Sequence, residues 1–426
     1  RLCRRGARTN PESSAAEDFI YMKPLWIWTG LILFFLLLCE SLFSQNQNPA
    51  DDAGKIIAIA DVHGDFDDFS QLLKQLGLVD QQNHWTGKTT RLIQTGDVID
   101  RGPKGREAMD LLMQLQKEAE NAGGQVVPLL GNHEVMNLLG DLRYVTPEDY
   151  AEFADKQSEE RRKKAYQEYA TWYKAHQTIL ANLNKSPFPA SEEQWTAAHP
   201  PGFLEYRDAF SPKGTYGRWI RTHSAVAQQR RILFLHGGIS PNVASMPVEE
   251  INSQVHKEIE DFDTTVQELI SHKVILPFFN IQEMLAAVQL ELHQPSEPLR
   301  NTSYHDNLVH LLDLSHWLCM REDGPLWFRG YDGWSDEEGA AQIEKILNAY
   351  GAEHAVVGHT VQKSKDIRTR FGGKVFLIDT GMLSSYWPGG RGSALEILGN
   401  KFVAHYVDGS EVPMEQKPQA PAAKSQ

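Results

Sequence analysis

Six side chains with metal-binding atoms follow short apolar stretches of this 426-residue chain. They supply two carboxylates, one amide and three imidazoles: Asp61, His63, Asp97, Asn132, His236 and His359. Oxygen and nitrogen ligands of this kind suit Mn, Fe or Zn, whereas Ca²⁺ prefers a shell of oxygens alone. The cysteines, Cys3, Cys39 and Cys319, are too few for a thiolate zinc site or a disulfide framework. The pattern therefore predicts a metal site built from His, Asp and Asn.

The six side chains lie in short sequence motifs, and the order and spacing of these motifs carry more information than any one motif. An Asp-x-His or a Gly-Asp on a loop is more often turn chemistry, in which Gly supplies a positive φ and Asp caps a helix. Here Lys55–Ala60, Arg91–Thr95 and Gln125–Leu130 are β-like runs, each followed by a polar loop. About 35 residues separate successive loops, the length of right-handed βαβ crossovers in a parallel sheet. We therefore expect the loops to meet at the carboxyl edge of the strands, where open α/β sheets bind ligands.

Later segments repeat the pattern of an apolar run followed by a polar loop. Arg231–Leu235, His354–Val357 and Val375–Ile378 lead into HGG, GHT and DTG. Ala394–Leu398 and Phe402–Val407 are expected as late strands of a second sheet that closes a sandwich. We therefore predict an α/β fold, a β-sandwich flanked by helices, whose βαβαβ core holds the metal site.

Two helix-rich inserts, at about 146–225 and 247–317, are predicted to interrupt this core. The first begins with a capping signal at Thr146–Asp149. Its charge run at Glu159–Lys164 is interpreted as a solvated helix face. The histidines of the second insert follow no ligand motif and are interpreted as ordinary surface or core residues: His256, His272, His293, His305, His310 and His316.

The start of the chain predicts export. Residues 1–21 are polar and patternless, and we interpret them as an over-extended start ahead of Met22. Residues 22–45 predict a signal peptide because Lys23 precedes the apolar run Leu25–Leu38, with an uncleaved membrane anchor as the alternative. The catalytic part is then expected outside the cytoplasm, periplasmic or secreted, with membrane association through residues 25–38 in the anchored version.

The overall composition bears on the size of the catalytic domain, on the C-terminal segment and on the partners of the chain. With 41% hydrophobic residues, the chain is able to bury one large catalytic domain, expected at 46–410. Residues 411–426 are rich in Pro, Ala, Gln and Lys and predict a disordered tail. The formal net charge of −14 argues against nucleic acid as a partner, because binding a phosphate backbone needs a basic face. Composition predicts no oligomeric state.

The ordered series DVHGD, GDVIDRG, GNHE, HGG and GHT supports a more specific prediction. It resembles the signature series of the phosphoprotein-phosphatase branch of calcineurin-like metallophosphoesterases, over roughly Lys55 to Val407. Within that branch, the predicted export, the inserts and the segment Leu326–Tyr331 are most similar to bacterial Shewanella-like protein phosphatases. The resemblance implies a metallophosphoesterase sandwich and a metal-dependent phosphomonoesterase whose partner is a phosphorylated protein, on phosphotyrosine, phosphoserine or phosphothreonine.

The resemblance also implies two divalent metal ions, with Mn preferred over Fe and Zn. Asp61 and His63 would hold one metal, and Asp97 would bridge to the other. The second metal would take its remaining ligands from Asn132, His236 and His359. Two metals about 3.5–4 Å apart clamp a bridging hydroxide and one phosphate oxygen, so attack proceeds in line without a covalent enzyme intermediate.

The remaining motif residues have roles in the same scheme. Arg101 and Arg329 would bind the phosphoryl oxygens, because a planar guanidinium matches phosphate in a bidentate way. Surface salt bridges are the alternative for these arginines. His133 would protonate the leaving group, with Asp100 holding its ring in position.

Departures from the family pattern bear on specificity. Thr360 and Val361 stand where the wider family often continues Gly-His-x-His, so water is expected to complete the shell of the first metal. Ala60 precedes the first Asp where Gly is usual, and Leu130 stands where the eukaryotic Ser/Thr enzymes commonly carry Arg. Those enzymes also carry a Ser-Ala-Pro-Asn-Tyr segment that this sequence lacks. The Shewanella-like group includes tyrosine-preferring enzymes, which favours phosphotyrosine here.

Two segments are candidates for shaping the substrate site, and packing is the alternative for both. Tyr216–Arg221 places two arginines and two aromatic residues shortly before HGG. Trp327 and Tyr331 flank Arg329, where they would stack on an aromatic leaving group.

Two other functions remain as alternatives. A diadenosine-polyphosphate or nucleotide hydrolase would use the same metal motifs on the same fold. An exported inactive binding module would keep the fold without activity, although the intact ligand set together with His133, Asp100 and Arg101 argues against it.

Overall fold

The computed structural model describes residues 54–180, 186–293 and 302–414. The predicted over-extended start and signal segment, 1–45, lie outside the described residues, as does most of the predicted tail. Among the described residues, no helix combines the length and apolar character needed to cross a membrane.

Two β-sheets form the centre of the fold. The first has the strand order β11-β10-β9-β1-β2-β3 and the second the order β4-β5-β6-β8-β7. The strands of the first sheet are β1 (Ile56–Ile59), β2 (Arg91–Gln94), β3 (Gln125–Pro128), β9 (Ser393–Leu398), β10 (Lys401–Tyr406) and β11 (Glu411–Pro413). Those of the second are β4 (Val226–Gln229), β5 (Ile232–Leu235), β6 (His354–Val357), β7 (Arg368–Arg370) and β8 (Val375–Leu377). Both sheets mix parallel and antiparallel pairs, with β1, β2 and β3 parallel in one and β5, β6 and β8 parallel in the other.

The two sheets pack face to face, which confirms the predicted sandwich. Successive side chains of a strand point to opposite faces. Ile56 and Ala58 of β1 therefore join a core cluster that includes residues of both sheets, whereas Ile57 joins the cluster shared with the helices. Phe376 of β8 stacks on Phe402 of β10 across the sandwich, with ring centroids 4.5 Å apart. Because both faces of β1 are buried, its sequence is apolar throughout instead of alternating.

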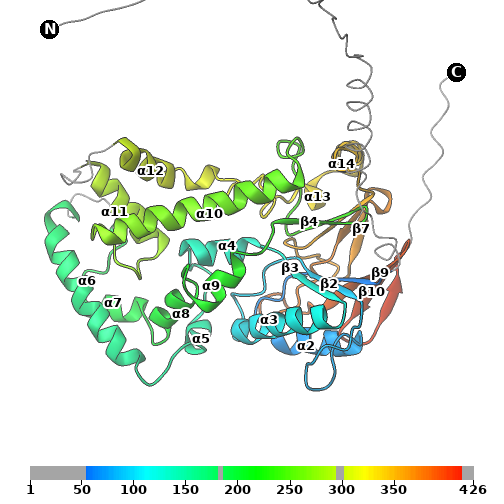
Figure 1. Ribbon diagram of the computed structural model, residues 1–426, viewed down its shortest axis with the longest axis horizontal. Coiled ribbons are helices and arrows are strands. Elements are labelled where there is room, and N and C mark those ends of the chain that lie inside the picture. Colours follow the sequence, from blue (N-terminus) through cyan, green and yellow to red (C-terminus); the bar gives the residue numbers. More distant parts are fainter. Residues whose placement is uncertain (1–53, 181–185, 294–301, 415–426) are drawn as a thin grey trace, which may run out of the picture. The chain divides into compact units, whose positions relative to one another are not determined.

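Helices cover the sandwich and continue into the two inserts (Figure 1). Along the parallel strands lie α2 (Phe66–Gln75), α3 (Gly105–Asn121) and α4 (Asn132–Leu139). The first insert holds α5 (Pro147–Ala151), α6 (Ser158–Leu180), α7 (Glu192–Ala198), α8 (Phe203–Ala209) and α9 (Thr215–Ile220). The second holds α10 (Val248–Ser271), α11 (Ile281–His293), α12 (Thr302–Leu312) and the short helix η3 (Leu314–His316). Later in the chain come α13 (Gly330–Gly333), α14 (Asp336–Ala349) and η4 (Phe371–Gly373).

The inserts pack on each other through buried aromatic side chains. Trp172 of α6 meets the ring of Phe279, which precedes α11, at a centroid distance of 4.8 Å. The indole nitrogen of Trp172 donates to the carbonyl oxygen of Val274, 3.0 Å away. At the start of the first insert, the Thr146 hydroxyl and the Asp149 carboxylate cap α5 reciprocally, as the sequence predicts. The inserts therefore add a helical core of their own.

One boundary of the sequence prediction is wrong. Glu411–Pro413, assigned to a disordered tail, form the edge strand β11 and pair antiparallel with β10. A turn at Asp408–Ser410 returns the chain onto the open edge of β10, where Asp408 accepts from the backbone of Ser410 at 2.9 Å. Proline is tolerated there because an edge strand needs no donor on its outer side.

Candidate metal centre

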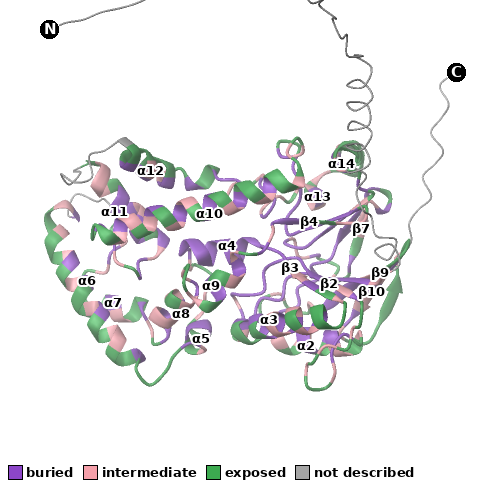
Figure 2. Ribbon diagram, viewed as in Figure 1, coloured by how far each residue is buried: buried purple, intermediate pink, exposed green. Residues whose placement is uncertain are grey.

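The predicted ligands lie where the strands end. They follow the strands in chain order: Asp61 and His63 after β1, Asp97 after β2, Asn132 after β3, His236 after β5 and His359 after β6. All six are buried, and none is more than 6% exposed. Asn132 is the first residue of α4, a helix buried on all sides between the sandwich and the inserts (Figure 2). The two parallel triplets of strands therefore bring the six side chains together, as predicted.

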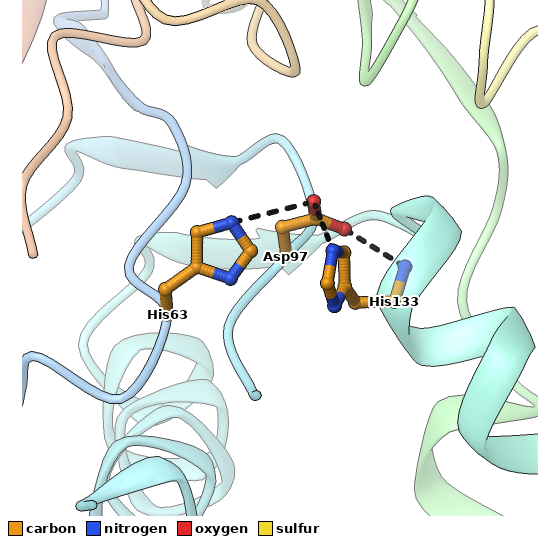
Figure 3. Close-up of side chains that lie close together, drawn as sticks. All are labelled: His63, Asp97 and His133. Atoms are coloured by element: carbon orange, nitrogen blue, oxygen red, sulfur yellow. Dashed lines mark hydrogen bonds and ion pairs between the residues drawn. The ribbon is translucent and has the colours of Figure 1, made fainter. Parts of the chain in front are cut away.

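Four of the predicted ligands, together with His133, form two groups of ligand atoms that share the Asp97 carboxylate. In one group, atoms of His63, Asp97 and His133 lie within 4.8 Å of one another, and in the other, those of Asp97, His236 and His359 do. Figure 3 shows the side chains of the first group pointing toward one another from three different elements. Asp61 adjoins this group, with its Oδ2 atom 3.8 Å from Nε2 of His63. Asn132 adjoins the second, with its Oδ1 atom 2.9 Å from Nε2 of His236. Asp97 thus occupies the position that a bridging ligand needs.

The histidine rings are held by one nitrogen and present the other to the site. Nδ1 of His63 donates to the carbonyl oxygen of Ile99, and Nδ1 of His236 to that of Thr95, both at 3.0 Å. Nε2 of His359 donates to the carbonyl oxygen of Trp327 at 3.1 Å, so Nδ1 is left with its lone pair. Metal-ligating histidines are oriented in this way by an acceptor on the far nitrogen. The donor set therefore fits divalent metal ions.

The charges of the site also favour a cation. Burial lowers the pKa of His63 to about 4, so its imidazole is neutral and keeps a lone pair at neutral pH. Burial lowers the pKa of His236 too, but the carboxylates of Asp97 and Asp61 outweigh it and raise that pKa to about 9. Nε2 of His236 lies 3.2 Å from Oδ2 of Asp97. The same convergence of oxygens that holds a proton on His236 is suited to a divalent ion.

Strained backbone positions these side chains. His63, Asp97 and His359 all have a positive φ, at 49°, 57° and 63°. A left-handed conformation is unfavourable for residues other than glycine and costs on the order of 1–3 kcal/mol each. At Asp97 it persists because Glu134 holds the loop after β2: its carboxylate accepts from the backbone nitrogens of Asp97 (2.7 Å), Val98 (2.8 Å) and Gly131 (2.9 Å). The GNHE motif contains Glu134, but sequence reasoning gave it no role.

The predicted proton donor and its partner are in contact. Nδ1 of His133 lies 2.7 Å from Oδ2 of Asp100, and both residues are fully buried. Nε2 of His133 has no hydrogen-bond partner among the described residues and lies 3.8 Å from Oδ2 of Asp97. Burial lowers the pKa of His133 to about 4 and raises that of Asp100 to about 8. The imidazole therefore presents an unused nitrogen to the metal centre.

Both predicted phosphate-binding arginines lie at the site. Nη1 of Arg101 donates to Nε2 of His63 at 2.9 Å. Nη1 of Arg329 donates to the carbonyl oxygen of His359 at 2.8 Å and to the hydroxyl of Thr360 at 3.1 Å. None of these three hydrogen bonds involves a carboxylate, so within the described residues the salt-bridge alternative is not supported for either arginine.

Two tyrosines at the site carried no sequence signal. The guanidinium carbon of Arg101 lies 5.1 Å from the ring centroid of Tyr144 and 4.0 Å from that of Tyr386. Both rings are among the large apolar side chains that the described part of the chain leaves exposed, at 39% and 45%. Each also adjoins a histidine of the site: Tyr144 lies 4.9 Å from His133 and Tyr386 lies 6.1 Å from His63, measured between ring centroids. They follow α4 and β8, outside every motif that the sequence identifies.

The two candidate substrate segments are used largely for packing. Tyr216 is buried and donates to Asp110 of α3 at 2.7 Å, and Arg221 forms a bidentate pair with Asp263 of α10. Tyr331 is 1% exposed, and its hydroxyl accepts from the backbone of Ile239. Trp327 is half-buried and donates to the carbonyl oxygen of Cys319. Packing is therefore the better interpretation of these four side chains.

A sandwich of mixed sheets with paired nitrogen and oxygen ligands beyond its strand ends defines a metal-dependent hydrolase class. The family model of calcineurin-like phosphoesterases matches residues 54–363, and the chain belongs to that family. The resemblance inferred from the five motifs is thus confirmed.

Similarity to individual proteins indicates which members of this family the chain resembles. The chain is 33% identical over 239 residues to Shewanella-like protein phosphatase 2 of Arabidopsis thaliana, a match that covers 53% of this chain and 58% of that protein. It is 25% identical over 363 residues to Shewanella-like protein phosphatase 1 of Plasmodium berghei, covering 84% and 75%. The crystal structure of a cold-active protein-tyrosine phosphatase of a psychrophilic Shewanella species matches with a TM-score of 0.53 at 23% identity, covering 85% and 81%. At this identity the structural likeness concerns the fold.

Proposed function

We propose that this chain is a metal-dependent phosphomonoesterase that removes phosphate from phosphorylated proteins, on tyrosine, serine or threonine. The observation that carries the proposal is the pair of ligand groups sharing Asp97, one of which includes His133, with two arginines beside them. Relatives that are named protein phosphatases support this substrate class.

The ligand groups suit two divalent ions, Mn before Fe or Zn. Asp61 and His63 would hold one ion, Asn132, His236 and His359 the other, and Asp97 both. When bound, such ions supply positive charge to the phosphate oxygens and lower the pKa of a water molecule for in-line attack.

The chain's own residues supply binding and proton transfer. Arg101 and Arg329 bind phosphoryl oxygens, and their charge stabilises the negative charge that builds up there during transfer. His133 gives a proton from Nε2 to the leaving oxygen, while Asp100, which holds the proton that it shares with Nδ1, keeps the ring oriented. The burial of His133 and Asp100 excludes water from this proton path.

We further propose that the chain is exported, periplasmic or secreted. The support is the apolar run Leu25–Leu38 behind Lys23, which lies outside the described residues. Fractionation of expressing cells, with the mass of the purified product, tests this: a mature chain starting near Gln45 means a cleaved signal, and a full-length chain in the membrane fraction means an anchor.

The test of activity is phosphate release by the full chain from matched phosphotyrosine and phosphoserine peptides and from a diadenosine polyphosphate, with Mn²⁺ added or chelated. We expect Mn²⁺-dependent turnover of phosphopeptide that Asp97→Asn abolishes, since both metal positions share Asp97. Glu258→Gln is the matched control, because Glu258 is a buried carboxylate that accepts from the backbone of Leu318 and Cys319, on α10 and outside the ligand groups. Turnover of the dinucleotide alone would favour a nucleotide hydrolase. Turnover of no substrate, with metal bound, would favour a binding module.

A further inference from the structure

A buried chain of hydrogen bonds connects the proton donor to the first helical insert. From Asp100, which is hydrogen-bonded to Nδ1 of His133, the chain continues to Asn137 of α4. Nδ2 of Asn137 lies 2.9 Å from Oδ1 and 3.0 Å from Oδ2 of Asp100. It also lies 2.9 Å from the carbonyl oxygen of His133. Oδ1 of Asn137 accepts from the hydroxyl of Tyr206 on α8 at 2.7 Å. None of these four residues is more than 3% exposed.

The chemistry of the groups fixes the direction of each bond. The Asp100 carboxylate and the His133 carbonyl are acceptors, so the side of Asn137 that faces them has to be its NH₂ group. The amide oxygen then points the other way and needs a donor, which a tyrosine hydroxyl provides. A flipped amide would place its oxygen against the backbone carbonyl oxygen of His133, which is two acceptors with no donor between them, and is therefore excluded. Tyr206 thus selects the amide orientation that serves Asp100.

Tyr206 is itself held rigidly. Its ring stacks on Phe210 at a centroid distance of 4.5 Å and meets Phe153 and Tyr150 edge-on at 5.0 and 5.3 Å. Burial raises the pKa of its hydroxyl well above the ordinary value, so the phenol keeps the proton that it donates. The aromatic core of the insert therefore fixes the far end of the chain.

At the other end of this hydrogen-bond chain, Asp100 also has to be held in position. Asp100 lies in the loop after β2 with a left-handed backbone, at φ 68°. The His133 ring is held through Nδ1, because Nε2 has no hydrogen-bond partner in the described part of the chain. The direction in which Nε2 points therefore depends on where the Asp100 carboxylate lies. Nδ2 of Asn137 lies within hydrogen-bond distance of both oxygens of that carboxyl group and so holds it in place.

We propose that Asn137 and Tyr206 are positioning residues, through which the helical insert aligns Asp100 and His133 for proton donation to the leaving group. The inference rests on the proposed phosphomonoesterase function and assigns the insert a part in it. Neither side chain is placed to bind a metal ion: Asn137 donates to Asp100 and to the backbone carbonyl oxygen of His133, and Tyr206 donates to Asn137. Their loss is expected to weaken proton donation while phosphate and metal binding stay intact.

The test is Tyr206→Phe in the full chain with Mn²⁺, assayed on phenyl phosphate and 4-nitrophenyl phosphate. Nitrophenolate is a better leaving group and needs a proton less. We expect kcat to fall about tenfold on phenyl phosphate and less than about threefold on 4-nitrophenyl phosphate. The KM values, inhibition by inorganic phosphate and bound Mn²⁺ are expected to stay unchanged. Tyr169→Phe is the matched control, because Tyr169 is a buried tyrosine of the same insert whose hydroxyl donates to the carbonyl oxygen of Pro189.

A double-mutant cycle tests whether Tyr206 acts through Asn137. Asn137→Ala is expected to give the same selective loss, and adding Tyr206→Phe to it no further loss, because coupled residues are not additive. Three results would each overturn the inference while the phosphatase function stands. They are equal losses on the two phosphate esters, a matching loss in Tyr169→Phe, and additive losses in the cycle. Absence of turnover by the unmodified chain would instead overturn the proposed function, and the inference with it.

Discussion

The unused nitrogen of His133 makes the effect of its loss depend on the substrate. Nε2 lies buried beside Asp97, while Nδ1 is committed to Asp100. His133→Asn is expected to lower kcat on a phosphoserine peptide by about 10²-fold and on a phosphotyrosine peptide by about tenfold. The difference arises because a phenol, with a pKa near 10, leaves with less need of a proton than an aliphatic alcohol. Steady-state kinetics on matched peptides measure both losses, and equal losses would contradict the role.

Tyr144 and Tyr386 bear on the choice between phosphotyrosine and phosphoserine. Both rings are exposed beside Arg101, where a substrate ring would pass on its way to the metal centre. Tyr386→Leu is expected to raise KM for a phosphotyrosine peptide about fivefold, which is the size of one lost aromatic contact, and to leave phosphoserine KM unchanged. Unchanged inhibition by inorganic phosphate would show that Arg101 has kept its place. A parallel rise for both peptides would mean that the ring serves Arg101 instead.

At the scale of the elements, the sequence was most informative where strands are short, apolar and followed by polar loops. β1, β2 and β3 and their loops were predictable because a parallel sheet buries both strand faces and gathers the loop residues at one edge. The capping signal at Thr146 was equally local and equally readable. The edge strand β11 was missed because its pairing depends on an open edge of β10, which composition does not reveal.

The residues that support the site could not be predicted from the sequence because they act through contacts between segments that lie far apart in the chain. Glu134 acts on the backbone of a loop 36 and 37 residues away. Tyr206 reaches Asn137 across 69 residues from an insert whose packing no local pattern specifies. Asp379 is buried, with one carboxylate oxygen unpartnered among the described residues, but the DTG sequence that contains it predicts no role. Ligands were recognisable by type, but these residues act through tertiary contacts.

The buried carboxyl group of Glu283, near the start of α11, is expected to make the stability of the fold depend on pH. Glu283 is 1% exposed and accepts from the backbone of Asn280 at 3.0 Å. Burial raises its pKa from 4.5 to about 7. The folded state therefore favours the protonated acid, so this group's stabilising contribution is present below pH 4.5 and is lost as the pH rises through about 7.

Glu283→Gln keeps the acceptor of this cap and removes the charge. We expect the variant to be more stable than the unmodified chain at pH 8, by about 1–2 kcal/mol, and the gap to narrow toward zero at pH 5. Thermal unfolding of both proteins across this range measures the gap. A gap that is independent of pH would mean that the carboxylate is not destabilised by burial.

At the scale of the whole molecule, stability and activity depend on the same buried carboxylates. Asp61, Asp97, Glu134 and Asp379 lie together at the strand ends, and none is more than 5% exposed. Burial raises the pKa of Asp61 and Glu134 to about 7 and that of Asp379 to about 6, a sign of how unfavourable their charges are without a cation. The sandwich tolerates this cluster because the inserts and the second sheet supply the surrounding core.

Mn²⁺ is therefore expected to stabilise the fold. An ion that binds the folded chain alone contributes about 2.7 kcal/mol at a free concentration one hundred times its dissociation constant. Asp97→Asn removes the shared ligand and the carboxylate that pairs with protonated His236. Burial by itself raises the pKa of Asp97, but the charges of the neighbouring histidines outweigh it and hold that pKa well below its usual value, so without metal the variant is expected to unfold at a lower temperature than the unmodified chain. With Mn²⁺ the gap between the two unfolding temperatures is expected to widen, because the unmodified chain gains stability and the variant does not. Thermal unfolding of both proteins with Mn²⁺ and with chelator measures this widening. Equal gains for the two proteins would place the stabilising ion away from Asp97, and with it the centre on which the proposed chemistry depends.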